Sequence, residues 1–293
     1  MQHQNLRRCC YGLAALFLLL STAASAATSV WQVSKGKHTL YLAGTFHLLN
    51  SADHPLPDAF EQAYLAADTL IFETDVSIAQ SPEYQRKAAA LVMFQDGRTL
   101  DSAIKPATYA ALEQFLTQRS LPIETFARLT PVGVSLMLSS IELQRLGMSA
   151  QQGVEYTFNL KASVDNKRRD YLETPDEQLQ FISRMGQGEE DDMLLYTIED
   201  LLSIETELAT MKRYWLTGDI TSMDSQYLQD MRTRFPRSYQ DLLVSRNNAW
   251  LPHIESMVKS DGTELVMVGA MHLPGPDGLL AQLQARGYQL KQQ

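Results

Sequence analysis

The chain has 293 residues, of which 45% are hydrophobic and 20% are charged, so its composition is that of an ordinary globular protein rather than a disordered one. Its 25 Lys and Arg residues stand against 34 Asp and Glu residues, which gives a formal net charge of -9 at pH 7. An acidic chain of this kind is unsuited to a broad polyanion-binding surface, so we expect no nucleic-acid partner.

Residues 1–26 have the three-part layout of a secretory signal peptide. Arg7-Arg8 is followed by the apolar run 11–20 and by small residues that end in Ala24-Ser25-Ala26. The run is shorter than the roughly 20 apolar residues that a spanning helix needs. We therefore expect cleavage after Ala26, a periplasmic or secreted location, and no stable membrane anchor after cleavage. An uncleaved anchor is the alternative.

The only two cysteines, Cys9 and Cys10, precede this apolar run, whereas a lipoprotein cysteine would follow it. A lipid anchor is therefore disfavoured. The mature chain 27–293 would contain no cysteine, which excludes disulfides, thiol nucleophiles and zinc thiolate sites from it. We expect it to form a single domain.

Short runs with high β-propensity open the mature chain. The runs 30–33 and 39–43 predict a hairpin, because a Gly-containing turn separates them. A helix is predicted from about Pro57, with apolar residues at helical spacing, and the apolar run 69–72 predicts a buried strand.

From about residue 81 to 258 the spacing of apolar residues is mainly helical. One interior strand is predicted at 169–172. A strand at 263–268, a helix at 276–285 and a strand at 288–290 complete the chain. The pattern predicts an α/β (α+β) fold whose central sheet is built from both ends of the chain, with a large helical insertion at about 81–258.

Two similar segments carry the candidate chemistry. Gly44-Thr45-Phe46-His47 and Gly269-Ala270-Met271-His272 each follow a predicted buried strand, and each precedes a Pro-Asp pair, a helix and a further strand. This duplicated β-GxxH-α-β pattern predicts that His47 and His272 meet at the carboxyl ends of neighbouring strands, where open α/β sheets bind ligands.

Glu73 ends the strand after the first of these segments and is expected at the same edge of the sheet. Two imidazoles and one carboxylate can hold a divalent metal with positions open for water and substrate. Without a metal, the same three groups can act as general acids and bases. The alternative is structural: a histidine at a strand end is often only hydrogen-bonded, and Glu73 could cap a helix or pair with an arginine. His54, near the first segment, is a candidate substrate contact.

Arg246 and Asn247 lie on a predicted amphipathic helix and are candidate substrate-binding residues. Arg246 could bind a substrate carboxylate or stabilise developing negative charge. The alternative is a solvated polar helix face.

Six ordered motifs resemble the TraB/GumN family from about Trp31 to the C-terminus. They are Gly44-Thr45-Phe46-His47, the segment 67–73, Leu172-Glu173-Thr174 with Glu177-Gln178, the segment 215–219, Arg246-Asn247-Asn248-Ala249-Trp250, and the segment 268–278. The resemblance implies kinship with the TraB/PrgY pheromone-shutdown proteins and with the Tiki metalloproteases, which depend on manganese or cobalt. Related folds include erythromycin esterases and haem-binding ChaN proteins.

The resemblance also implies site residues. The active-site residues proposed for the family correspond here to His47, His272 and Glu73. The family's Arg-Asn pair corresponds to Arg246-Asn247. One departure is Glu155 in Gly153-Val154-Glu155, where the family usually has Asp.

From these patterns and the resemblance we expect an exported metal-dependent hydrolase that cuts a peptide bond in a peptide or protein substrate. The resemblance suggests Mn²⁺ or Co²⁺, with Zn²⁺ as an alternative, held by His47, His272 and Glu73, while Arg246 stabilises the oxyanion. The alternative function is a non-catalytic periplasmic or secreted protein that binds or sequesters a peptide, polysaccharide or haem. Haem is the least favoured ligand, because neither histidine sits in a recognised haem motif.

Overall fold

The structure is a computed structural model that describes residues 27–293. The predicted signal peptide and both cysteines lie outside the described residues. Within them, six strands form one mixed sheet in the order β4-β3-β5-β2-β1-β6. The strands are β1 (Val30–Lys35), β2 (His38–Thr45), β3 (Thr69–Phe72), β4 (Arg168–Tyr171), β5 (Glu264–Gly269) and β6 (Gln289–Gln292).

Both ends of the chain contribute to the centre of the sheet. β1 and β2 form the predicted antiparallel hairpin, in which Lys35 pairs with His38 around Gly36. β5 lies between β2 and β3 and pairs in parallel with both. The prediction that the two GxxH segments follow neighbouring parallel strands is therefore confirmed, and so is the predicted α/β fold class.

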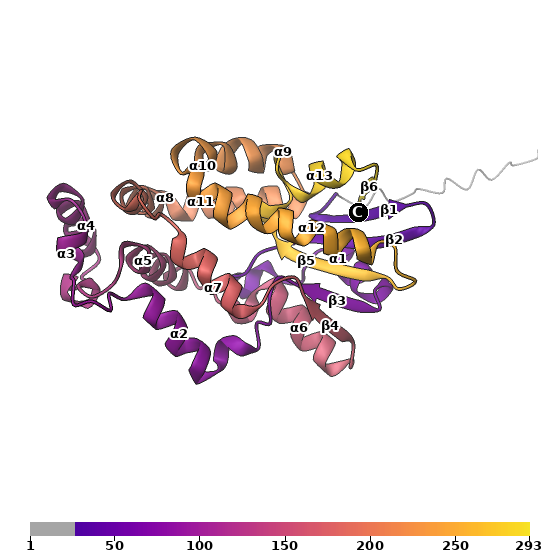
Figure 1. The fold of residues 1–293 in the computed structure, drawn as a ribbon, viewed down its shortest axis with the longest axis horizontal. Helices are drawn as coiled ribbons and strands as arrows, with labels where there is room; N and C mark the ends of the chain where they lie inside the picture. Colours follow the sequence, from indigo (N-terminus) through magenta and orange to yellow (C-terminus); the bar gives the residue numbers. More distant parts are fainter. Residues whose placement is uncertain (1–26) are drawn as a thin grey trace, which may run out of the picture.

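Helices cover both faces of the sheet. Successive residues of β5 point to opposite sides of the sheet, and those on each side pack against a different pair of helices. Leu265 and Met267 pack against α1 (Asp58–Ala66) and α6 (Val154–Val164). Val266 and Val268 pack against α12 (Ser245–Met257) and α13 (Leu279–Ala285). In Figure 1, α12 is drawn across the sheet and α13 lies beside β6. The result is a three-layer arrangement, with β5 buried on both faces.

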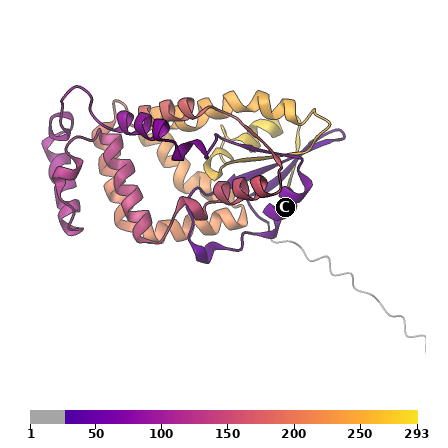
Figure 2. The same cartoon turned by 90° about the horizontal axis from the view of Figure 1, so that it is seen from below.

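The helical insertion between β3 and β5 extends away from the sheet (Figures 1 and 2). Its longest helix, α8 (Glu190–Thr217), packs against α4 (Pro106–Gln118) and α5 (Pro131–Arg145) around a separate apolar cluster. The remaining helices of the insertion are α2 (Pro82–Val92), α3 (Leu100–Ala103), α6, α7 (Pro175–Arg184), α9 (Ile220–Met223), α10 (Gln229–Arg234), α11 (Pro236–Tyr239) and α12.

Helix ends follow local chemistry. The Thr130 hydroxyl accepts from the backbone N–H of Gly133 at the start of α5, where Pro131 takes the first helical position. Gly218 ends α8 with a φ of 59°, the left-handed conformation that glycine adopts without strain.

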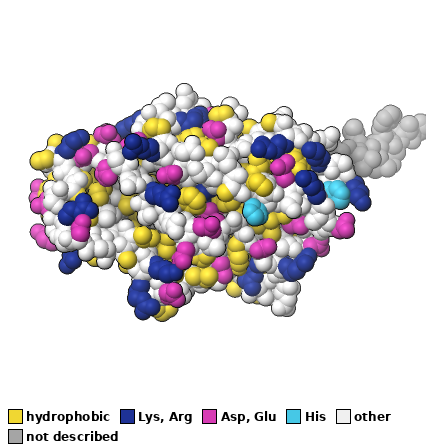
Figure 3. Space-filling view, viewed as in Figure 1, with side chains coloured by type: hydrophobic (Ala, Val, Ile, Leu, Met, Phe, Trp, Pro, Cys, Tyr) yellow, Lys and Arg dark blue, Asp and Glu magenta, His cyan; other side chains and the backbone are white. Residues whose placement is uncertain are grey.

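No helix of residues 27–293 combines the length and apolarity needed to cross a bilayer. On the face drawn in Figure 3, basic and acidic side chains lie interspersed.

One predicted boundary is wrong for a specific reason. The last helix begins at Leu279 rather than at Pro276, because the preceding residues form a turn in which Gly275 has a φ of 82°. The Asn247 amide donates to the carbonyl of Asp277 at 2.9 Å and fixes this turn. The Pro-Asp pair that suggests a helix start therefore belongs to a turn that connects to the site.

Candidate functional site

The carboxyl ends of β2, β3 and β5 meet at one edge of the sheet and bring the predicted residues together. His47 follows β2, Glu73 follows β3 directly, and His272 ends a 3-10 turn, Ala270–His272, after β5. A Cβ added at Gly269 would lie 3.2 Å from His47 Nε2 and 3.3 Å from Glu73 Oε1. Glycine therefore leaves a space between the imidazole and the carboxylate that any larger residue would fill.

Glu73 is buried, with only 6% of its surface exposed. Its Oε1 accepts from the backbone N–H of Gly269 at 2.6 Å, and its Oε2 accepts from Arg246 Nη2 at 2.6 Å. Burial by itself raises the pKa of Glu73, but its interactions with His272, Arg246 and His47 and the hydrogen bond from Gly269 outweigh burial and lower the pKa to about 2. Glu73 is therefore ionised at neutral pH.

The His47 side chain is 58% exposed, and its Nδ1 lies 2.7 Å from Glu155 Oε1. The same oxygen of the buried Glu155 carboxylate accepts from the Thr45 hydroxyl. The Glu155 charge raises the pKa of His47 to about 9, although solvent at the exposed ring screens part of this attraction. With Nδ1 directed at Glu155, Nε2 points to the space beside Gly269.

His272 has the opposite environment, because only 4% of its surface is exposed. Its Nδ1 lies 2.7 Å from Asn247 Oδ1, and its Nε2 lies 3.0 Å from Arg246 Nη1. The Asn247 amide nitrogen donates to two backbone carbonyls, so Oδ1 is the acceptor and Nδ1 of His272 carries the hydrogen. Burial lowers the pKa of His272 to about 3, with Arg246 and His47 contributing, although Glu73 opposes this effect. The ring is neutral, and both of its nitrogens are engaged.

Arg246 joins these groups, and all five of its N–H donors have acceptors. Nε and Nη2 bind the Glu173 carboxylate in a bidentate pair at 3.0 and 2.7 Å, and Nη2 also donates to Glu73. Nη1 donates to His272 and to the carbonyl of Leu242. A substrate oxyanion would have to displace one of these bonds. In this geometry Arg246 and Asn247 therefore act as positioning residues, and their predicted substrate-binding role stays a prediction.

One site thus contains both GxxH segments, the acidic end of β3 and the Arg-Asn pair. The family comparison covers all of these segments. The model of the TraB/PrgY/gumN family matches residues 29–292. The chain belongs to the TraB/PrgY/gumN family.

Curated relatives cover nearly the same span. The uncharacterized protein YbaP of Escherichia coli (strain K12) is 24% identical over 253 residues, which is 85% of this chain and 88% of that protein. The uncharacterized protein YbaP of Shigella flexneri has the same identity and coverage. No solved structure matches the chain significantly.

The metal site predicted for this family member does not fit the observed geometry. Among residues 27–293, no group of three or more His, Cys, Asp or Glu side chains is arranged to hold a metal ion. The physical reason lies at His272, whose Nε2 lone pair accepts from Arg246 and whose Nδ1 carries a hydrogen toward Asn247. The set of His47, His272 and Glu73 thus lacks one available ligand atom, and the metal stays a prediction.

Two residues of the site had no role assigned from the sequence. Glu155, noted only as a departure from the family pattern, orients His47, and Glu173 holds Arg246. For Glu155 the sequence does offer a local signal, which is the glycine two positions before it. Gly153 packs so closely that an added Cβ would lie 2.1 Å from the carbonyl oxygen of His47, which brings the start of α6 against the first GxxH segment. His54, the candidate substrate contact, bonds through Nε2 to the carbonyl of Gln152 at 2.9 Å.

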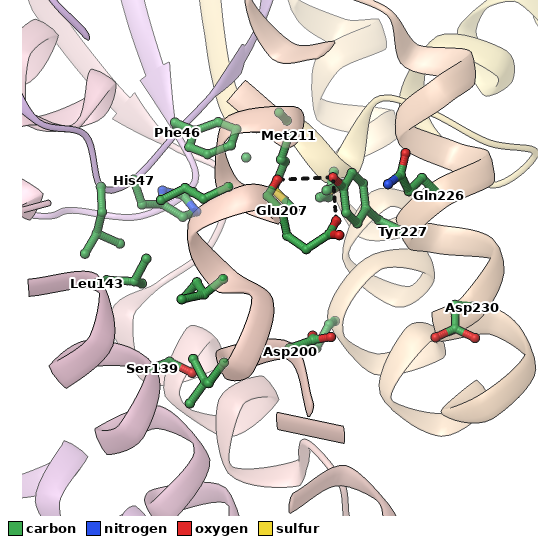
Figure 4. A pocket seen from close by; sticks show the side chains of 18 of the residues that line it. Phe46, His47, Ser139, Leu143, Asp200, Glu207, Met211, Gln226, Tyr227 and Asp230 are labelled. Atoms are coloured by element: carbon green, nitrogen blue, oxygen red, sulfur yellow. Dashed lines mark hydrogen bonds between the residues drawn. The ribbon is translucent and has the colours of Figure 1, made fainter. Parts of the chain in front are cut away.

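Two cavities meet at His47. The first, of about 850 Å³, lies between the GxxH segments and α8, and Figure 4 shows His47 at one side of it and Tyr227 and Asp230 at the other. The second, of about 710 Å³, lies toward α6 and α7. His47, Leu242 and Arg246 line both, so the open imidazole nitrogen stands where the two cavities adjoin.

Proposed function

We propose that this protein is an exported hydrolase that cuts a peptide bond within an extended segment of a peptide or protein. The observation that carries the proposal is the position of His47 between two cavities. An extended chain that occupies both cavities has one bond beside His47 Nε2 and Glu73 Oε1. Export rests on the predicted signal peptide 1–26 and would direct the protein to the periplasm or the exterior.

The proposed reaction uses His47 as the general base. A water in the space beside Gly269 gives a proton to Nε2 of neutral His47 and attacks the substrate carbonyl carbon. The ionised Glu73 orients this water by accepting its second hydrogen. Glu155 accepts from Nδ1 and stabilises the imidazolium that forms, and His47 then donates its new proton to the leaving amine nitrogen. A positioned acid–base group of this kind contributes about 10²–10⁴-fold to the rate.

The remaining groups hold this arrangement. Arg246 fixes one oxygen of Glu73, and the backbone N–H of Gly269 fixes the other. Glu173, His272 and Asn247 in turn hold Arg246 and the turn that follows β5. Because these bonds lie in a buried network, they keep the carboxylate in one orientation before substrate binds.

Peptide cleavage by the purified chain 27–293 tests the proposal. A mixture of synthetic peptides is incubated with the protein, and new termini are identified by mass spectrometry. We expect cleavage by the wild type and by His253→Ala, a matched control at an exposed histidine of α12. His47→Ala and Glu73→Gln should lose at least a hundredfold in rate. Unchanged cleavage by His47→Ala would contradict the proposal.

A binding protein without catalysis is the second candidate. The observation that favours it is the complete engagement of Arg246 and His272, which leaves only His47 and Glu73 facing the open space. In that case the wild type binds peptides or glycans in the two cavities but yields no new termini at any pH.

A further inference from the structure

The second cavity contains two buried polar atoms that lack partners. Within residues 27–293, neither Glu155 Oε2 nor Thr74 Oγ1 has a hydrogen-bond partner, and each residue is only 6% exposed. Both residues line this cavity. Burying a carboxylate oxygen without a hydrogen-bond donor costs free energy. A ligand group that supplies a donor there therefore contributes more binding free energy than the same group would at the surface.

The chemistry of Glu155 defines what that group must be. Its Oε1 already accepts from Thr45 and contacts His47, and Oε2 can only accept when the carboxylate is ionised. The complementary ligand group is therefore a hydrogen-bond donor. A cationic donor fits best, because charge-assisted hydrogen bonds are about twice as strong as neutral ones.

The other charges around the cavity are close to balanced, so the choice of ligand rests on Glu155. Glu73, Asp75 and Glu155 bring negative charge to the lining, whereas Arg169, Arg246 and protonated His47 bring positive charge. Arg246 is already neutralised by Glu73 and by Glu173 behind it. Arg169 is exposed and donates to the neutral side chain of Asn159 at 3.0 Å.

Aromatic rings also contribute to the lining of this cavity. Tyr84, Tyr156 and Phe181 line the same cavity. Aromatic faces attract ammonium groups through their quadrupoles.

We propose that the second cavity is a subsite for an ammonium group of the substrate, which donates to Glu155 Oε2. The ammonium group belongs either to a free amino terminus or to a lysine side chain. The Thr74 hydroxyl binds an uncharged polar group of the same ligand. This inference rests on the proposed function for its substrate class, a peptide, but it concerns binding and not bond cleavage.

The test measures peptide affinity by isothermal titration calorimetry with the chain 27–293. One short peptide is made in four versions, with a free or acetylated amino terminus and with lysine or its uncharged analogue norleucine. We expect the version or versions with the correct ammonium group to bind about tenfold to a hundredfold more tightly than the doubly neutral version. The two singly charged versions show which ammonium group is recognised.

Two variants assign the effect to this cavity. Glu155→Gln places an amide where the carboxylate was and should reduce the preference for the charged versions to less than about threefold. Thr74→Val should weaken all four versions alike, by about threefold to tenfold, whereas Thr233→Val, at an exposed threonine of α10, should change none. Circular dichroism confirms that each variant is folded.

The outcomes separate the two proposals. Equal affinity of the wild type for all four versions overturns the ammonium subsite, even if peptides are cleaved. A charge preference that survives in folded Glu155→Gln also overturns it. A charge preference that depends on Glu155, without cleavage by the wild type, supports the subsite and contradicts the hydrolase.

Discussion

His47 and His272 occupy the same place in two copies of one motif, yet their environments set their pKa values apart. His47 is exposed beside the Glu155 carboxylate, which raises its pKa, and His272 is buried beside Arg246, where burial lowers its pKa. Titratable groups whose environments separate their pKa values in this way take different roles. The motif alone predicts the two histidines to be equivalent, because nothing in GxxH shows that α12 covers only the second.

Single substitutions should therefore have different consequences at the two histidines. We expect His272→Ala to lower the free energy of unfolding by about 2 to 4 kcal/mol, because it leaves one N–H of Arg246 Nη1 and the Asn247 Oδ1 atom without their partner in a buried region. His47→Ala should lower it by less, about 1 kcal/mol, since it removes the partner of Glu155 but solvent at the exposed ring screens that pair. Urea denaturation followed by circular dichroism measures both. Equal destabilisation would show that the two histidines have equivalent structural roles.

At the scale of elements, the strand β5 and the turn after it control the space for the proposed water. Gly269→Ala would place a methyl group 3.2 Å from His47 Nε2 and 3.3 Å from Glu73 Oε1. The backbone there has a φ of -50°, which alanine adopts without strain. We expect Gly269→Ala to lose at least about tenfold in peptide cleavage while its stability changes by less than about 1 kcal/mol.

The control for this substitution is Gly262→Ala. An added Cβ there would meet its nearest atom at 3.5 Å, an ordinary contact, far from the site. It should cleave peptides as fast as the wild type. Undiminished cleavage by Gly269→Ala would mean that the reacting water does not occupy this space.

Most elements could be predicted from the sequence because their signals are local. The apolar run of β3 and the helical spacing of α8 each suffice to predict the element that forms. The two π-helical turns, Asp224–Leu228 and Gln240–Val244, could not be predicted in this way, since apolar spacing does not distinguish a single π turn inside a helix. The second of these turns leads directly into α12 and Arg246.

At the scale of the whole molecule, the site depends on contacts between distant parts of the chain. Glu155 lies in the insertion, 110 positions from Thr45, and Glu173 lies 73 positions from Arg246. The sequence predicts that the ends of β2, β3 and β5 converge, because parallel strands share one edge. It does not predict how the insertion folds back, so the two carboxylates that orient His47 and Arg246 could not be assigned beforehand.

The buried network also makes stability depend on pH. The folded pKa values of His272, about 3, and Glu73, about 2, lie below their ordinary values of 6.5 and 4.5. At these two groups the unfolded chain binds more protons than the folded chain as the pH falls from about 6.5, which lowers stability. Burial raises the pKa of Asp200 to about 6 and also raises the pKa of Glu173, which acts in the opposite direction. We therefore expect the thermal midpoint of the wild type, relative to that of His272→Gln, to decrease between about pH 6.5 and pH 4. An equal change in the two proteins would contradict the assigned protonation state of His272.

Metal removal separates the acid–base account from the metal-dependent one. Because His272 offers no free nitrogen lone pair, we expect cleavage to persist after dialysis against EDTA and to change less than about twofold on addition of Mn²⁺ or Co²⁺. Loss of cleavage on dialysis and its recovery with either ion would instead support the predicted ligands His47, His272 and Glu73. In that case Arg246 would have to release His272.

The pH dependence of kcat/KM for peptide cleavage tests the role of the His47–Glu155 pair most directly. A base must lose its proton before it acts, and Glu155 raises the pKa of His47, so the wild-type rate should increase with pH through a midpoint above 6.5. Glu155→Gln keeps a hydrogen-bond acceptor but removes the charge, and the midpoint should move to lower pH. A midpoint that stays in place or moves to higher pH in this variant would contradict the account.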